Sequence, residues 1–322
     1  MPKVSVVIPC YNAERYLDRA IASVQEQGFT DWELIAVDDC STDNTITLLE
    51  KHSARDKRIR VLRTPANGGP SVARNLAFDQ SVGEFIAILD ADDAYEPERL
   101  ERMLFYAEQS GADLAFDNLT FFDDHLKIRT GRTVVGSSNG EYSTLSLEEL
   151  IFAEGPRSKL KYGYLKPVFR TTFLRQHALR YSETLRLAED FDLYLRAVLF
   201  GAKAIIVPDA MYVYTTQTGL SSGTQSQGTR TSYRPEIRIG MMTQIMDDFA
   251  GSISSDTAAL LKLCLGWQRL YADAHRLGEL RRTGQWGHFW KLALKHPAAL
   301  SRFLWRSKLF RSPGDTLRVA IK

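Results

Sequence analysis

Three carboxylates follow the most apolar strand that the sequence predicts. Residues 85–89 (FIAIL) are apolar, and Asp90, Asp92 and Asp93 come directly after them. Like charges at this spacing repel each other and must be solvated or paired. An Asp-x-Asp at a strand end offers hard oxygen ligands for Mg²⁺ or Mn²⁺, with phosphate oxygens and water in the remaining positions. A solvated turn would show the same spacing, so other residues must decide between the two.

Polar residues also follow two earlier predicted strands. Asp38 and Asp39 close a strand over residues 32–39, and Tyr11 and Asn12 come after the first strand. The alternative for this pair of aspartates is a plain loop, because the cap-type residues 41–43 stand directly behind them.

Two helix starts add further candidates. The glycines of NGGP, residues 67–70, let a backbone approach a ligand, and the helix behind them has free amides that favour anions. Glu189 and Asp190 open a later helix. Acids in a first helical turn also serve as partners of the helix dipole, so neither signal is specific alone.

The elements that must position these residues alternate along the first 120 residues. Strands are predicted at residues 4–9, 32–39, 59–63, 85–89 and 112–118, and helices at 13–26, 41–53, 70–80 and 97–110. This order predicts an α/β fold with parallel pairing and right-handed crossovers. In such a sheet, ligands bind beyond the carboxyl ends of the strands, which brings the candidates to one edge.

The later part of the chain is less regular. A helix is predicted over residues 185–201 and a strand pair over 202–214. The Gly/Ser/Thr/Gln-rich segment 215–233 is long for a loop and is typical of active-site lids. The remainder is predicted to be helical.

Composition and charge exclude several classes of protein. The net charge is +2, but residues 285–322 hold eight Lys/Arg and one acid, so this tail carries +7 and the rest −5. An acidic rim argues against nucleic-acid binding. Three cysteines without metal-site spacing, an immediate first strand and the lack of a long apolar run predict a cytoplasmic chain without a signal peptide or membrane span.

The motifs PCYNAE, VDDCSTDNT, NGGPSVARN, ILDADD and AEDFDL, in this order, resemble the inverting glycosyltransferases of family 2. The resemblance covers roughly residues 3–215. It implies the GT-A nucleotide-sugar fold, a Rossmann-like mixed sheet flanked by helices. Residues 164–196 are similar to bacterial exopolysaccharide glycosyltransferases of the succinoglycan type.

The resemblance implies a role for each matched position. It places the nucleotide and its ribose against Pro9, Tyr11, Asn12, Glu14, Asp38, Asp39, Asn67, Gly68, Arg74, Asp90 and Ala91. Asp92, with Asp90 beside it, would hold the Mg²⁺ or Mn²⁺ that bridges the diphosphate. Asp190 would be the catalytic base, with Glu189 as its neighbour. A base of this kind takes the proton of the attacking hydroxyl, on the face of the sugar opposite the leaving diphosphate.

The resemblance further implies transfer from a UDP-sugar, with UDP-glucose the expected donor, to a lipid-linked or oligosaccharide acceptor. The Q-x-x-R-W motif of processive members is missing, because GWQRL at residues 266–270 does not match it. We therefore expect one sugar per encounter. Lys166 has two interpretations, a contact to donor or acceptor and a plain surface lysine.

Three alternatives stay open. A haloacid-dehalogenase-type phosphatase also uses Asp-x-Asp, but after its first strand, whereas here the motif follows the fourth. A dinucleotide oxidoreductase would carry G-x-G-x-x-G where this chain has PCYNAE. An inactive nucleotide-sugar-binding module would not need both Asp92 and Asp190.

The predicted domains are a catalytic domain over residues 1–235 and a helical extension over 236–322. The catalytic domain divides into a nucleotide-binding half, 1–120, and an acceptor half, 121–235. The basic tail 285–322 also contains six aromatic residues, Trp286, Phe289, Trp290, Phe303, Trp305 and Phe310, and Pro297 divides it into two predicted helices. Trp305 and Leu309 share one predicted helix side with Arg302 and Arg306, which makes a mixed apolar and basic face. Such a segment fits the cytoplasmic face of a membrane, a helical cap or a dimer contact.

Overall fold

The computed structural model describes residues 1–133, 141–155, 162–216 and 235–306. Its strands are β1 (Val4–Cys10), β2 (Trp32–Asp38), β3 (Ile59–Arg63), β4 (Phe85–Ile88), β5 (Ala94–Tyr95), β6 (Leu114–Asp123), β7 (Ile128–Thr133), β8 (Ser143–Thr144), β9 (Val168–Arg170) and β10 (Ala204–Thr216). Its helices are α1 (Leu17–Gln25), α2 (Thr45–Arg55), α3 (Pro70–Gln80), α4 (Arg99–Ser110), α5 (Leu147–Phe152), η1 (Tyr162–Tyr164), α6 (Thr171–Gln176), α7 (Glu189–Leu199), α9 (Pro235–Asp248), α10 (Ser255–Arg282), α11 (Trp286–Lys295) and α12 (Pro297–Arg306). The predicted lid beyond residue 216 lies outside the described residues.

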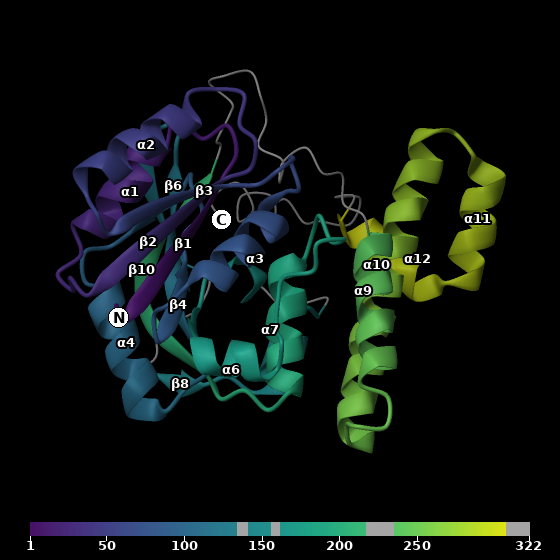
Figure 1. The fold of residues 1–322 in the computed structure, drawn as a ribbon. Coiled ribbons are helices and arrows are strands. Elements are labelled where there is room, and N and C mark those ends of the chain that lie inside the picture. Colours follow the sequence, from purple (N-terminus) through teal and green to yellow (C-terminus); the bar gives the residue numbers. More distant parts are fainter. Residues whose placement is uncertain (134–140, 156–161, 217–234, 307–322) are drawn as a thin grey trace. The chain divides into compact units, whose positions relative to one another are not determined.

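The strands form one mixed sheet in the order β3-β2-β1-β4-β9-β6-β10-β5. The first four in chain order pair in parallel, with Val7 aligned to Ile35 on one side and to Ile88 on the other. Branched residues such as Val6 and Ile8 are fully buried in β1, as expected for a central strand covered on both faces. Figure 1 shows α1, α2 and α4 on one side of these strands and α3, α6 and α7 on the other. The predicted mixed α/β fold with C-terminal helices is confirmed.

The structure departs from the predicted elements in two places. β9 enters the sheet antiparallel between β4 and β6, where the sequence indicated only a mixed aromatic and basic segment. The predicted strand pair over 202–214 is one long strand, β10, whose register with β6 shifts between Val207 and Tyr212. Pro208 lies within this shifted stretch, and because proline cannot donate to a strand ladder, the sequence suggested a break there.

The chain separates into two compact units. The first contains residues 1–153 and 158–230, and the second contains 154–157 and 231–322. The predicted boundary after residue 235 stays a prediction. In the second unit, α11 and α12 pack on α10 around a small buried cluster. Among the described residues no helix is long and apolar enough to cross a membrane.

Candidate active site

A lysine joins carboxylates from two distant segments at the carboxyl edge of the sheet. Lys166 Nζ lies 2.6 Å from Asp190 Oδ2, at the start of α7, and 3.1 Å from Asp90 Oδ2, just after β4. The lysine side chain is only 5% exposed. The surface-lysine interpretation is therefore wrong, and the lysine lies between the predicted base and the predicted donor-side acid.

A buried arginine from α3 makes a second bridge across the same cluster. Arg74 Nη2 donates to Asp90 Oδ1 at 2.6 Å, and Arg74 Nη1 lies 3.6 Å from both Glu189 Oε1 and Asp190 Oδ1. The guanidinium also lies over the Tyr181 ring, with its carbon 4.9 Å from the ring centroid. Of the described residues, none donates a hydrogen bond to Asp190 Oδ1, which is buried. One oxygen of Asp190, the predicted base, thus accepts a hydrogen bond from Lys166, and the other has no donor among the described residues.

Burial and neighbouring charges shift the pKa values of this cluster in opposite directions. Burial opposes ionisation of Asp90, but Lys166 and Arg74 outweigh it and lower the pKa of that carboxyl well below its usual value. Burial also opposes the charge of Lys166, but Asp190 and Asp90 raise its pKa well above the ordinary range. Burial, and then the charge of Asp190, raises the pKa of Glu189. The bridged groups are therefore stable as ion pairs.

Asp92 differs from its neighbours because no ion pair reaches its carboxyl group in the described part of the chain. Burial, and next the charge of Asp90, raises the pKa of Asp92 to about 6. The charges of Lys166 and Arg19 act in the opposite direction and lower this pKa, but neither forms an ion pair with the Asp92 carboxyl group. An external divalent cation would be a direct partner for this carboxyl group.

The third acid of the motif has a structural role. Asp93 is 1% exposed, accepts a hydrogen bond from the Tyr212 hydroxyl at 2.7 Å and accepts another from the Thr215 amide at 2.7 Å. The Tyr212 hydroxyl in turn accepts from the Asp90 amide. Asp93 therefore fixes β10 and the backbone of the motif.

The NGG segment is organised by Asp39. The Asp39 carboxylate accepts from the amides of Gly68 at 2.9 Å and Gly69 at 2.6 Å, and from the Thr64 hydroxyl at 2.7 Å. Asn67 donates through its side chain to the Asp39 carbonyl. Three of the predicted nucleotide-side residues thus form one hydrogen-bonded unit, and a contact of Asp39 to the base of a nucleotide stays a prediction.

The remaining predicted nucleotide-side residues border this unit. Asp38 is buried, accepts from the Ser41 amide and pairs with Arg63. Asn12 accepts from the Thr42 amide at 2.8 Å, and Glu14 accepts from both the amide and the side chain of Asn44 at 2.9 Å. Pro9 and Ala91 are at the ends of β1 and of the apolar strand, and Tyr11 is 42% exposed. Glu14 and Asp38 act here on the loop before α2, and their nucleotide roles stay predictions.

One exposed arginine connects the NGG segment with the loop before α7. Arg186 Nη1 donates to the Gly68 carbonyl at 2.7 Å. Gly69 has a φ of +86°, and a Cβ built there would lie 1.8 Å from Arg186 Nη1. This contact of Arg186 could not be predicted, because no local spacing relates Arg186 to Gly68, which lies 118 positions earlier.

Gly69→Ala is therefore expected to destabilise the protein. A positive φ costs a residue with a side chain about 1–2 kcal/mol, and Arg186 must also leave its position. Thermal unfolding should show a lower midpoint, and binding of a nucleotide should weaken. Gly28→Ala is the matched control, because a Cβ there meets only the end of a glutamate side chain at 3.9 Å. Equal midpoints for the two variants would contradict the expectation that Gly69 is needed for its positive φ and for its close approach to Arg186.

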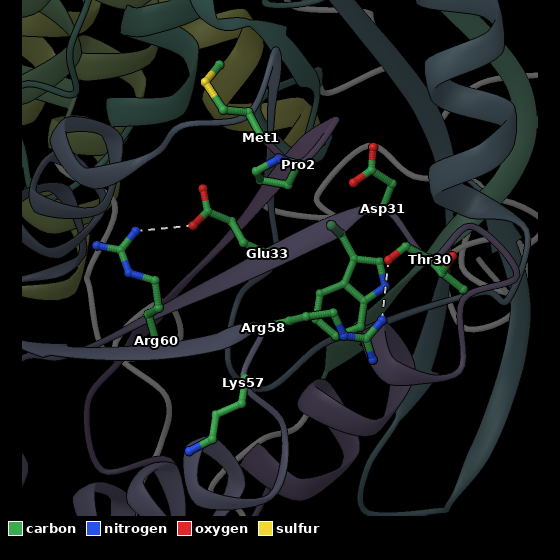
Figure 2. A pocket seen from close by; sticks show the side chains of 9 residues that line it. Met1, Pro2, Thr30, Asp31, Glu33, Lys57, Arg58 and Arg60 are labelled. Atoms are coloured by element: carbon green, nitrogen blue, oxygen red, sulfur yellow. Dashed lines mark hydrogen bonds and ion pairs between the residues drawn. The ribbon is translucent and has the colours of Figure 1, made fainter.

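One hollow on the first unit lies away from this cluster. It has a volume of about 370 Å³ and precedes the first residues of β1, β2 and β3 (Figure 2). Arg60 forms an ion pair there with Glu33, and the Arg58 guanidinium lies over the Trp32 ring, so both arginines of the hollow have partners within the protein. This hollow is at the amino ends of the strands and has no acid cluster.

The fold and the cluster define an enzyme that handles nucleotide sugars: a sheet edge with an acid pair after its central strand and a carboxylate from a later helix opposite. The protein-family model described as "Glycosyl transferase family 2" matches residues 5–173 of this chain. The chain belongs to this family, as the sequence motifs predicted, and the predicted hexosyltransferase class is confirmed.

Individual relatives agree with this membership. The succinoglycan biosynthesis protein ExoO of Rhizobium meliloti is 36% identical over 68% of this chain and 62% of its own length. ExoU of the same organism is 32% identical over 99% of this chain and 92% of its own length. The crystal structure of S. aureus TarS 1-349 in complex with UDP-GlcNAc superimposes with a TM-score of 0.65 at 26% identity, over 82% of this chain and 70% of that one. The GT-A fold is confirmed.

Proposed function

We propose that this protein transfers one sugar from a UDP-sugar to an acceptor hydroxyl, with inversion at the anomeric carbon and with the help of a divalent cation. The observation that carries the proposal is the bridge through Lys166. It places Asp190, from α7, within reach of the same ammonium group as Asp90, from the Asp-x-Asp motif. A sugar donor bound at the Asp-x-Asp motif and an acceptor hydroxyl bound at Asp190 would then lie close to each other.

The base chemistry follows from the two oxygens of Asp190. Lys166 donates to Oδ2, and this fixes the orientation of the carboxylate. Oδ1 meets no hydrogen-bond donor among the described residues, so it can accept the proton of an incoming hydroxyl. Arg74, 3.6 Å away, keeps this oxygen in a positive field. Lys166 and Arg74 act as positioning residues for the base.

The donor set at the motif fits Mg²⁺ or Mn²⁺. Such cations are often held by one or two carboxylates together with substrate phosphates. Asp92 offers a carboxylate without an internal cation, whereas both oxygens of Asp90 are already paired, so Asp92 would be the protein ligand. No cluster of three or more His, Cys, Asp or Glu able to hold a metal occurs among the described residues, which agrees with a site completed by the substrate. The cation would stabilise the charge that develops on the leaving diphosphate.

The choice of donor and acceptor rests on relatives. TarS binds UDP-GlcNAc, and ExoO and ExoU are succinoglycan biosynthesis proteins. We propose UDP-glucose as the donor, with UDP-GlcNAc as the competing candidate, and a lipid-linked or oligosaccharide acceptor of a bacterial surface glycan. An inactive binding module is disfavoured because the chain holds the base in an ion-paired, buried arrangement that binding alone does not require.

A thermal-shift screen tests the donor and the cation together. UDP, UDP-glucose, UDP-GlcNAc and GDP-mannose are each added with and without Mn²⁺. A ligand at 100 times its Kd stabilises the folded state by about 2.7 kcal/mol. We expect a UDP compound to raise the midpoint only when Mn²⁺ is present, and we expect Asp92→Asn to remove that rise.

The matched control is Asp209→Asn, which breaks a surface pair with Arg102 and should leave the ligand response unchanged. If UDP stabilised the protein equally well without Mn²⁺, the proposed role of a divalent cation would be contradicted. The absence of stabilisation by every nucleotide would contradict sugar transfer itself.

A further inference from the structure

One face of α11 closes a small core in the second unit. Phe289 and Ala293 of this helix are buried, and they pack with residues of the two neighbouring helices, Ala274, Leu277, Ala299 and Phe303. The Phe289 and Phe303 rings meet edge to face, with centroids 5.6 Å apart. This contact fixes which face of α11 points inward.

A face of α11 next to the buried one carries an exposed apolar stripe. Trp286, Trp290 and Leu294 stand at positions i, i+4 and i+8, so they lie above one another on the helix. They are 52%, 55% and 81% exposed. Both indole rings meet the buried Phe289 ring edge to face, at centroid distances of 5.7 Å and 5.2 Å, and this holds them in place. We call these three residues the tryptophan stripe.

The surroundings of the tryptophan stripe are positively charged. Residues 280–306 contain six Lys/Arg and no Asp or Glu. Lys291 and Lys295, both exposed, each follow a stripe residue by one position and therefore lie about 100° around the helix from it. The face thus combines interfacial aromatic residues with a row of cations along one side.

We propose that the tryptophan stripe docks on an anionic lipid surface, with α11 lying in the plane of the interface. Tryptophan rings concentrate at the level of lipid head groups, and basic amphipathic helices bind anionic leaflets. Contact with a second copy of this face would bring two such sets of cations together without acids between them. The inference adds a lipid-binding site to the transfer reaction and narrows the expected membrane contact of residues 285–322 to α11.

Vesicle co-sedimentation of the full chain tests this site. The probes are vesicles of phosphatidylcholine alone and of phosphatidylcholine with 30% phosphatidylglycerol. We expect binding to the anionic vesicles that weakens as salt rises, because each base near the surface contributes electrostatic attraction. Trp286→Ser with Trp290→Ser should weaken partition at least about tenfold, and Lys291→Glu with Lys295→Glu should remove the dependence on salt.

Phe105→Ser is the matched control, because Phe105 is also an exposed aromatic residue (55%), on α4 of the first unit, and should leave partition unchanged. Thermal midpoints and the nucleotide-induced shift are measured for every variant, so loss of folding or of donor binding is separated from loss of lipid binding. Unchanged partition of the tryptophan variant overturns the proposal, as does equal binding to neutral vesicles. A dimer by light scattering that the tryptophan variant converts to a monomer would overturn it in favour of a second copy.

Discussion

Asp190→Asn is expected to reduce sugar transfer by about 10³-fold, within the range that a lost general base usually costs. The asparagine keeps the shape of the side chain and an oxygen for Lys166, but it cannot take the proton of the acceptor hydroxyl. Donor binding should remain, since the donor meets the Asp-x-Asp motif. Release of nucleoside diphosphate in the presence of acceptor, together with the Mn²⁺-dependent thermal shift, measures the two effects separately.

Asp192→Asn provides the control within the same helix. Asp192 is also buried, but its partner is Arg196, at 2.5 Å, and not a residue of the cluster. We expect this variant to keep transfer within about threefold of the wild type, because the Asp192–Arg196 pair lies within α7 and involves no residue of the cluster. Comparable losses for both aspartates would show that α7 needs its acids for folding and not for chemistry.

Arg99→Leu is expected to cause the largest loss of stability. Arg99 is fully buried and donates twice to Asp117 at 2.8 Å and once to the carbonyl of Lys166. Its guanidinium carbon lies 4.2 Å from the Tyr95 ring centroid. Removing one partner of a buried pair costs about 3–5 kcal/mol, which lowers the thermal midpoint by about 6–20 °C. Calorimetry on the full chain measures the shift.

The deficit of Arg99→Leu should depend on pH. Burial already raises the pKa of Asp117, and Arg99 is the charge that opposes this rise. Without the arginine, the folded-state pKa lies further above the unfolded value, so the variant gains stability relative to the wild type as the pH falls. Arg99→Leu combined with Asp117→Leu should recover part of the loss, because no buried charge is left alone. A double variant as unstable as the sum of both singles would contradict this explanation.

Much of the site could be predicted from the sequence because its residues stand at the ends of elements. Asp90, Asp92 and Asp190 each follow a strand or open a helix, and a parallel sheet brings such positions to one edge. The order of the motifs then indicated the family. The same reasoning predicted α3 with its bounds and the stop of α4 at Gly111, which has a φ of +68°.

The cations of the cluster could not be predicted in the same way. Lys166 lies in an irregular segment, and its contacts come from residues far away in the chain, among them Arg99 of α4, which donates to its carbonyl. Arg74 was expected beside a nucleotide, but its contacts to Asp90 and Asp190 arise from tertiary packing. The position of β9 was also missed, because three residues give no usable periodicity. Contacts between residues that are far apart in the sequence cannot be predicted from the local spacing of residue types.

The antiparallel strand β9 has a consequence for synthesis of the chain. It lies between β4 and β6, so these two strands are joined in the sheet only after residues 168–170 have been synthesised. When β6 has just been made, β9 and β10 are still missing, so β4 and β6 both present unpaired strand edges, which are prone to mispairing. The sheet is therefore completed late during translation, when β10 has also been synthesised.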